Sequence, residues 1–254
     1  MRRAPESIPW WPDLSVRHHG TELMDDPESD PGELRRTLRQ FPFLNRFVSR
    51  SRYLLNRYIL ADIRRRGLKE VQLLDVGAGA GDIARYLVTT VRRVCDTVMH
   101  VDCCEADPRV AEFARRASAG YPTITVLERS VFDLSGGRYD YVISNHFLHH
   151  LSGPDIVRFL DLSRRLCTGT LLCNDLERSR ISYSAYRIAA PTILRGSFAA
   201  YDGALSIRRG FLREELEAAL FRSAWSQGSS AEALGAVRVG RIEPGRVYLV
   251  ARKR

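Results

Sequence analysis

The chain has 254 residues, 44% of them hydrophobic, which can bury a full core and suits one large domain with an elaboration. No apolar run is long enough to span a membrane, and the proline-interrupted start, Met1 to Trp11, lacks the apolar block of a signal peptide. The five cysteines form no C-x-x-C pair, so reduced cysteines in the core are expected. These features favour a soluble, cytoplasmic protein that does not associate with membranes.

The net charge of +9 is compatible with nucleic-acid binding, but only two of the 39 basic residues are lysines. Ten arginines fall between residues 35 and 66, and seven between residues 178 and 213. Solvated helix faces account for most of them, and the others could attract an anionic substrate. Nucleic acid is therefore not the expected partner.

The N-terminal part is predicted to be an arm followed by helices. Residues 1–32 are irregular and acidic, whereas apolar residues recur at helical spacing from Pro31 onward. Pro42 predicts a break between two helices, and Gly67 predicts the end of the second. We expect residues 1–66 to form a lid and residues 67–254 to form the core.

Strands and helices alternate in the core. Residues 176–210 interleave aromatic residues with arginines without a clear period, which we interpret as an inserted cap. The chain is predicted to be α/β, with a Rossmann-like, seven-stranded, mostly parallel sheet, an antiparallel terminal strand, N-terminal helices and the cap insertion. The predicted strands are 71–76, 97–104, 124–127, 139–144, 168–173, 236–242 and 247–251, the last two forming a hairpin.

The clearest motif is residues 71–82, in which a buried strand leads into a loop with glycines at positions 77, 79 and 81. Glycines let the backbone approach a ligand, and the following helix offers free N–H groups, so the segment is typical of a nucleotide site. A dinucleotide loop follows G-x-G-x-x-G, but Asp82 replaces the last glycine here. Asp75, two residues before the first glycine, suits an ammonium group.

The pattern D-x-G-x-G-x-G at residues 75–81 resembles the first motif of class I S-adenosylmethionine-dependent methyltransferases. Sheets of that family end with an antiparallel strand, which agrees with the closing hairpin. The resemblance implies S-adenosyl-L-methionine as the cofactor. The residues expected to bind it are Asp75, Gly77, Ala78, Gly79, Gly81, Asp82, Glu105, Ala106, Ser130, Val131 and Asn145.

Two acids compete for the ribose hydroxyls, since a carboxylate at the end of the second strand can accept hydrogen bonds from both. Glu105 stands at the strand end and is preferred to Asp102, which lies inside the strand. For the adenine amino group the family usually places an aspartate after the third strand, where this chain has Ser130. Asp133 or neighbouring backbone groups could share that contact.

Three histidines follow the fourth strand, where open α/β sheets bind ligands, and histidine can accept a proton near neutral pH. Residues 148–152, Leu-His-His-Leu-Ser, resemble the Leu-His-Asp-Trp-Ser segment of phenolic O-methyltransferases. This implies His149 as the base, with His146 or His150 as alternatives, and a structural role is equally open for each. No metal is expected, because adjacent histidines on one turn should point apart.

Residues 174–180, 22–27 and 45–46 resemble a bacterial branch of the ubiquinone/menaquinone-biosynthesis-like small-molecule methyltransferases. The predicted substrate contacts are Asp175, Tyr183 and Tyr186. Asp175 could orient a substrate hydroxyl or a histidine, or it could cap a helix.

The sequence thus predicts methyl transfer to a small molecule, preferably O-methylation of an aromatic or polyketide-type secondary metabolite. The alternatives are C- or N-methylation of a quinone-like acceptor, an RNA methyltransferase, and a nonenzymatic partner protein of the same fold. Against RNA, the segment after the fourth strand is not of the Asn-Pro-Pro-Tyr type that stacks a flipped base. The acceptor atom and the oligomeric state are not predicted.

Overall fold

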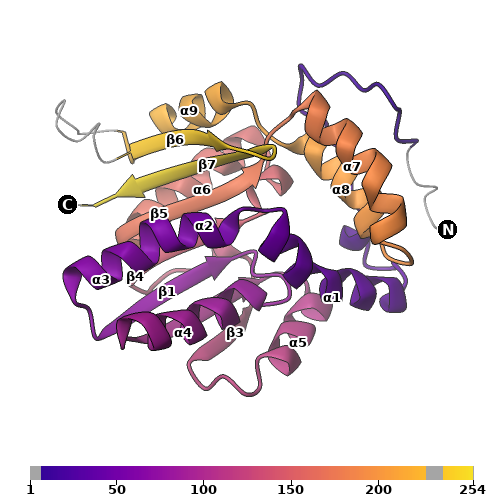
Figure 1. Ribbon diagram of the computed structural model, residues 1–254. Helices are drawn as coiled ribbons and strands as arrows, with labels where there is room; N and C mark the ends of the chain where they lie inside the picture. The colour runs from indigo at the N-terminus through magenta and orange to yellow at the C-terminus, as the bar shows by residue number, and fades with distance from the viewer. Residues whose placement is uncertain (1–6, 227–236, 254) are drawn as a thin grey trace.

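The computed structural model describes residues 7–226 and 237–253. Its centre is a seven-stranded sheet in the order β3-β2-β1-β4-β5-β7-β6 (Figure 1). Neighbouring strands are parallel from β3 through β5, whereas β7 is antiparallel to both β5 and β6. The strands are β1 Glu70–Val76, β2 Val98–Glu105, β3 Ile124–Glu128, β4 Tyr139–Asn145, β5 Cys167–Leu176, β6 Val237–Ile242 and β7 Arg246–Arg252.

The predicted fold class is confirmed by this sheet and by its antiparallel terminal strands. Ala236, the first residue predicted for the sixth strand, lies outside the described residues. The α-helices are α1 Pro31–Phe47, α2 Ser51–Leu55, α3 Ala61–Arg66, α4 Asp82–Cys95, α5 Pro108–Ala117, α6 Gly153–Leu166, α7 Arg180–Ile193, α8 Ala199–Arg209 and α9 Arg213–Arg222. A π-helical turn, Asn56–Leu60, joins α2 to α3.

The sheet has an apolar core on each face. Ile63 of α3 and Leu87 of α4 belong to one core, and Phe159 of α6 and Leu216 of α9 belong to the other. Burial on both faces explains the apolar runs within the central strands, such as Leu73 and Leu74 of β1 and Val142 and Ile143 of β4. The carboxyl ends of the parallel strands point toward α1, α7 and α8, which lie together at that edge (Figure 1).

Two sequence features agree with the described residues. The five cysteines are free thiols, and four of them are buried. In residues 7–226 and 237–253, no helix combines the length and the apolar character needed to cross a membrane.

One expectation about helices was wrong. Pro42 lies inside α1 without ending it, because burial of Leu34 and Leu38 offsets the hydrogen bond that proline cannot make. The chain turns later, at Arg50, which has a left-handed φ of 57°.

The segment predicted to be a cap, residues 176–210, contains α7 and α8, which pack against each other.

The apolar stripe of α7 is hidden in the sequence by apolar residues that the structure leaves exposed. Tyr183, Tyr186 and Ala190 recur at i, i+3 and i+7, which places them on one side of the helix. Tyr183 packs with Leu14 of the N-terminal arm, and Tyr186 and Ala190 pack toward α8 and α1. Because Ile181 and Ile188 are exposed, the helical period cannot be read from apolar residues alone.

Candidate functional site

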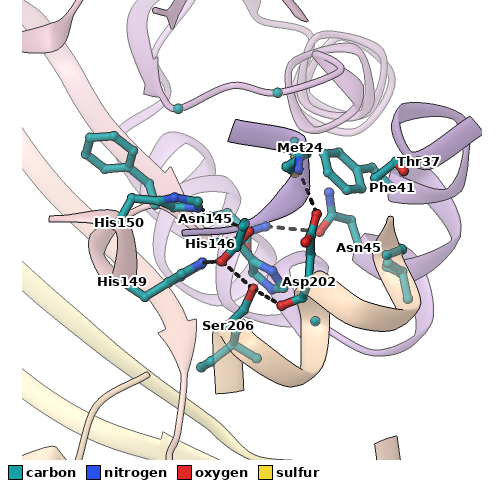
Figure 2. A pocket seen from close by; sticks show the side chains of 18 of the residues that line it. Met24, Thr37, Phe41, Asn45, Asn145, His146, His149, His150, Asp202 and Ser206 are labelled. Carbon is teal, nitrogen blue, oxygen red and sulfur yellow. Dashed lines mark hydrogen bonds and ion pairs between the residues drawn. The ribbon is translucent and has the colours of Figure 1, made fainter. Parts of the chain in front are cut away.

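A cavity of about 560 Å³ lies at the carboxyl edge of the sheet, a size typical of small-molecule sites. The strand ends form its floor, and α1, α7, α8 and the N-terminal arm surround it (Figure 2). Gly81 does not line it but precedes α4 behind the loop, with a φ of 69°. Ten of the predicted cofactor residues do line it, namely Asp75, Gly77, Ala78, Gly79, Asp82, Glu105, Ala106, Ser130, Val131 and Asn145.

The glycine loop lies close against the end of β2. The Gly77 N–H donates to the Cys104 carbonyl at 2.9 Å, and the Gly79 N–H donates to Glu105 Oε2 at 3.0 Å. Gly77 has a φ of 66°, and a Cβ there would lie 2.6 Å from a ring carbon of Phe147. This loop therefore needs glycine for both its conformation and its space.

The acids of the cavity suit a cationic ligand that carries hydroxyl groups. Burial raises the pKa of Asp75 to about 8, with contributions from the charges of Asp82 and Glu105, and Asp75 Oδ2 has no hydrogen-bond partner. Burial also raises the pKa of Glu105. Asp102, the alternative to Glu105, is outside the cavity lining and accepts a hydrogen bond from the Tyr139 hydroxyl at 2.8 Å.

A chain of asparagines holds α1 against the strand ends. Asn174 donates to Asn145 at 2.7 Å, Asn145 donates to Asn45 at 3.0 Å, and Asn45 donates to both oxygens of Asp82 at 3.2 Å. The amides of Asn145 and Asn45 both donate and accept along this chain, which fixes the wall of the cavity beside the glycine loop.

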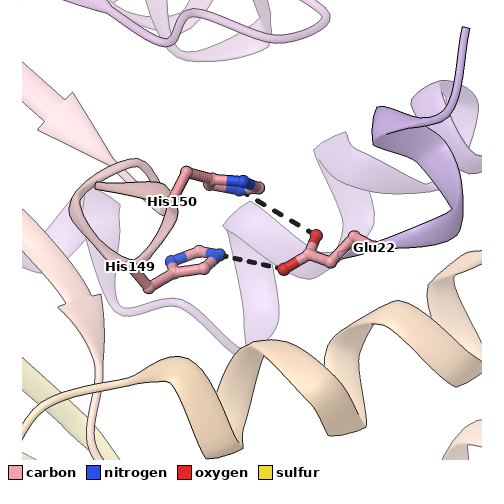
Figure 3. Close-up of side chains that lie close together, drawn as sticks. All are labelled: Glu22, His149 and His150. Carbon is pink, nitrogen blue, oxygen red and sulfur yellow. Dashed lines mark ion pairs between the residues drawn. The ribbon is translucent and has the colours of Figure 1, made fainter. Parts of the chain in front are cut away.

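His149 is buried between two carboxylates from distant parts of the sequence. Its Nδ1 lies 2.7 Å from Asp175 Oδ1, and its Nε2 lies 3.4 Å from Glu22 Oε1 (Figure 3). Burial opposes ionisation of the ring, but Asp175 and Glu22 outweigh it and raise the pKa of His149 to about 9. Glu22, His149 and Asp175 therefore form a charged relay in which the imidazolium is the favoured form at neutral pH.

The relay also sets how stability should depend on pH. A histidine with a folded pKa of about 9 and an ordinary value of 6.5 contributes stability that is complete below pH 6.5 and is lost as the pH rises through 9. Between pH 6.5 and pH 9 we expect the melting temperature to fall further in the wild type than in His149→Gln. The additional fall should correspond to a loss of roughly 2 kcal/mol in the free energy of unfolding. Scanning fluorimetry across the range measures both slopes, and equal slopes would contradict the ionised relay.

The rings of His149 and His150 lie 4.3 Å apart, so the expectation that adjacent histidines point apart was wrong. One ligand atom each from Glu22, His149 and His150 lies within 4.8 Å of the others, close enough to surround a cation (Figure 3). However, Glu22 Oε1 already accepts from the Ser206 hydroxyl at 2.7 Å and lies 3.5 Å from Arg209. Because Ser206 and Arg209 already engage the Glu22 carboxylate, we still predict that no metal ion binds here.

The other two histidines differ from His149. His146 has a left-handed φ of 59° and accepts a hydrogen bond at Nε2 from Arg246. Burial and the charge of Arg246 lower the pKa of His146 well below its usual range, so this ring is neutral. His150 lies at the cavity with Nδ1 3.2 Å from Asp25.

Of the three predicted substrate contacts, only Tyr186 lines the cavity. Asp175 lies behind His149 and therefore holds a histidine, one of the roles considered for it. Tyr183 was expected to contact the substrate, but it does not line the cavity. Its hydroxyl donates to the Pro9 carbonyl, and its ring packs with the arm. The face of α7 toward the cavity is formed instead by Ser182, Ala185, Tyr186, Ala189, Ala190 and Ile193.

Several residues of the site carry no signal in the sequence that would predict their role. Glu22 stands out only as part of the motif at residues 22–27, and Asp202 and Arg246 belong to no motif. Asp202 of α8 accepts hydrogen bonds from the N–H groups of Leu23 and Met24 at 2.7 and 3.1 Å (Figure 2). These bonds tie the arm to α8 and place Glu22 beside His149.

Comparison with known proteins identifies a domain and a fold. Residues 74–170 match the family model described as a methyltransferase domain. No curated protein matches the chain. The plantazolicin methyltransferase BpumL in complex with SAH is 13% identical, with a TM-score of 0.63 over 91% of this chain and 93% of that one. A SAM-dependent methyltransferase from Aquifex aeolicus is 18% identical, with a TM-score of 0.53 over 89% and 99%.

Proposed function

Since residues 74–170 match the model of a methyltransferase domain, we propose that the protein is a class I S-adenosylmethionine-dependent methyltransferase, which transfers a methyl group from S-adenosyl-L-methionine to an oxygen of a small molecule. One observation carries this proposal: a single cavity joins the glycine loop, Asp75 and Glu105 to the histidine relay beneath α7 and α8. An aromatic or polyketide-type secondary metabolite is the acceptor class that we favour. Apolar side chains such as Phe41, Leu44 and Leu194, which line the same cavity, support it.

The residues of the cavity fit the cofactor group by group. Asp75, with its unpartnered Oδ2, would hold the ammonium group, and Glu105 would accept from the ribose hydroxyls. Ser130 Oγ accepts from the Phe132 N–H at 3.2 Å, so the adenine would rest mainly on Val131 and Phe132. The bound cofactor supplies an electrophilic methyl group on a sulfonium sulfur.

The relay would remove the proton that an acceptor hydroxyl loses on methylation. Asp175 accepts from Nδ1–H of His149, which leaves Nε2 as the proton acceptor once the ring is neutral. Glu22 faces this nitrogen from the arm and would hold the acceptor hydroxyl against it. The remaining task of the protein is alignment for an in-line displacement.

Calorimetric titration of S-adenosyl-L-methionine and of its demethylated product tests the proposal. Glu105→Gln should weaken binding by roughly 10- to 100-fold, because a charge-assisted pair of hydrogen bonds to the ribose is lost. Asp102→Asn is the matched control and should bind as the wild type does, since Asp102 lies outside the cavity lining. Unchanged affinity of Glu105→Gln would reject the ribose contact, and a wild type that binds neither compound would reject the proposed function.

A further inference from the structure

Arg246, the first residue of β7, is a buried cation without a carboxylate partner. Its side chain lines the cavity, and the residue is only 3% exposed. Among the described residues, no carboxylate lies within ion-pair distance of its guanidinium. The Nη1 group donates to His146, whereas Nε has no hydrogen-bond partner.

Two of the three other buried arginines that the structure describes pair with a carboxylate. Arg178 donates to both oxygens of Glu215 at 2.8 Å, and Arg209 lies 3.5 Å from Glu22. Arg208 also has buried nitrogens without partners, but it lies outside the cavity lining. Because an unpaired buried charge is costly, Arg246 is an exception at the site that needs an explanation.

The acids near Arg246 are shared with other cations. Both oxygens of Asp175 accept hydrogen bonds, from the His149 ring and backbone and from the Leu176 N–H. Glu22 is held by His149, Ser206 and Arg209, as described above. The negative charge of Asp175 opposes the lowering of the Arg246 pKa by burial, but this carboxylate is paired directly with His149. Arg246 therefore has no carboxylate of its own.

Two features define what would bind there. Nη1 is engaged by His146 and Nε is enclosed by the protein, so a carboxylate in the cavity would meet the guanidinium at Nη2. Arg246 pairs with Leu176 at the end of β5, on the far side of β4 from the glycine loop. The charge thus lies on the acceptor side of the cavity, which apolar residues such as Ala189 and Ile207 also line.

We propose that Arg246, supported by His146, binds a carboxylate of the methyl acceptor, so that the acceptor is an apolar molecule bearing an acid group. This inference rests on the proposed function, because Arg246 lines the same cavity as the glycine loop. The carboxylate anchors the acceptor and leaves its hydroxyl to the relay.

Calorimetry with matched acid and amide pairs tests this inference, with and without the demethylated cofactor. The probes are benzoate, 4-hydroxybenzoate and 2-naphthoate, each beside its carboxamide. The wild type should bind at least one carboxylate about tenfold or more tighter than its amide, and Arg246→Met and Arg246→Gln should reduce this preference to about twofold or less. Because the unpaired charge is removed, Arg246→Met should also melt at or above the wild-type temperature, whereas Arg178→Met, which leaves Glu215 unpaired, should melt lower.

The outcomes separate the two proposals. No preference for any carboxylate, or the same preference in the wild type and in both Arg246 variants, would overturn the anchor even where the demethylated cofactor binds normally. A clear preference that depends on Arg246, in a protein that does not bind the demethylated cofactor, would support the anchor and reject the methyltransferase assignment. Melting of Arg246→Met as far below the wild type as Arg178→Met would show that Arg246 is structural and would also overturn the anchor.

Discussion

His149→Ala is expected to keep the wild-type affinity for S-adenosyl-L-methionine and to lose turnover by roughly 10²- to 10⁴-fold, the usual contribution of a general base. The ring lies between Asp175 and Glu22, so its removal eliminates the proton acceptor without changing the glycine loop or Glu105. Turnover is measured as transfer of a labelled methyl group to whichever phenolic or carboxylic acceptor the wild type modifies. Turnover at the wild-type level would reject His149 as the base.

His100→Ala is the matched control for this experiment. His100 also lies beside a carboxylate, with Nε2 3.1 Å from Glu70, but both side chains are exposed and neither lines the cavity. Its replacement should leave turnover unchanged.

The pH dependence of the same reaction distinguishes a base from a structural residue. Because the pKa of His149 is about 9, the wild-type rate should increase with pH toward that value as the neutral ring becomes populated. Glu22→Gln removes one of the anions that raise this pKa, so its profile should rise at lower pH. A merely structural histidine would not move the profile.

Gly79→Val is expected to abolish measurable cofactor binding while the protein still folds. Gly79 has a φ of 53°, which a β-branched residue rarely adopts, and its N–H donates to Glu105 inside the cavity. The new side chain would displace the loop from this position and occupy ligand space. Calorimetry with S-adenosyl-L-methionine measures the loss, and an unaltered affinity would exclude the loop as the cofactor site.

Gly120→Val separates this effect from a general cost of losing glycine. Gly120 has no left-handed φ, and a Cβ there would meet nothing within 4 Å. This variant should bind the cofactor as the wild type does, and circular dichroism of both variants verifies that they are folded.

The part of the cavity that we propose binds the cofactor could be predicted from local sequence. Asp75 and the glycines belong to one strand, loop and helix, and Glu105 ends the next strand, so their relative positions follow from the parallel pairing of β1 with β2. Glu105 remains the residue that we predict to bind the ribose, because it lines the cavity and Asp102 does not.

The part of the cavity that we propose binds the methyl acceptor depends on contacts between distant segments. Tyr183 and Tyr186 are three residues apart in one helix, yet only Tyr186 lines the cavity, whereas Tyr183 packs with Leu14 of the arm. Helical periodicity could not separate them, because residues three positions apart lie on the same side of a helix.

The sequence by itself determined the order of the strands, the glycine loop and the acids predicted to bind the cofactor, since these depend on periodicity and on residues within one supersecondary unit. Only the tertiary structure decided that Glu22 reaches His149 and that Arg246 reaches His146. These partners lie 127 and 100 residues apart in the chain, and no local pattern encodes their meeting. The motif that predicts the methyl donor is therefore contiguous in the sequence, whereas the proposed acceptor site is formed by the packing of the arm, α8 and β7.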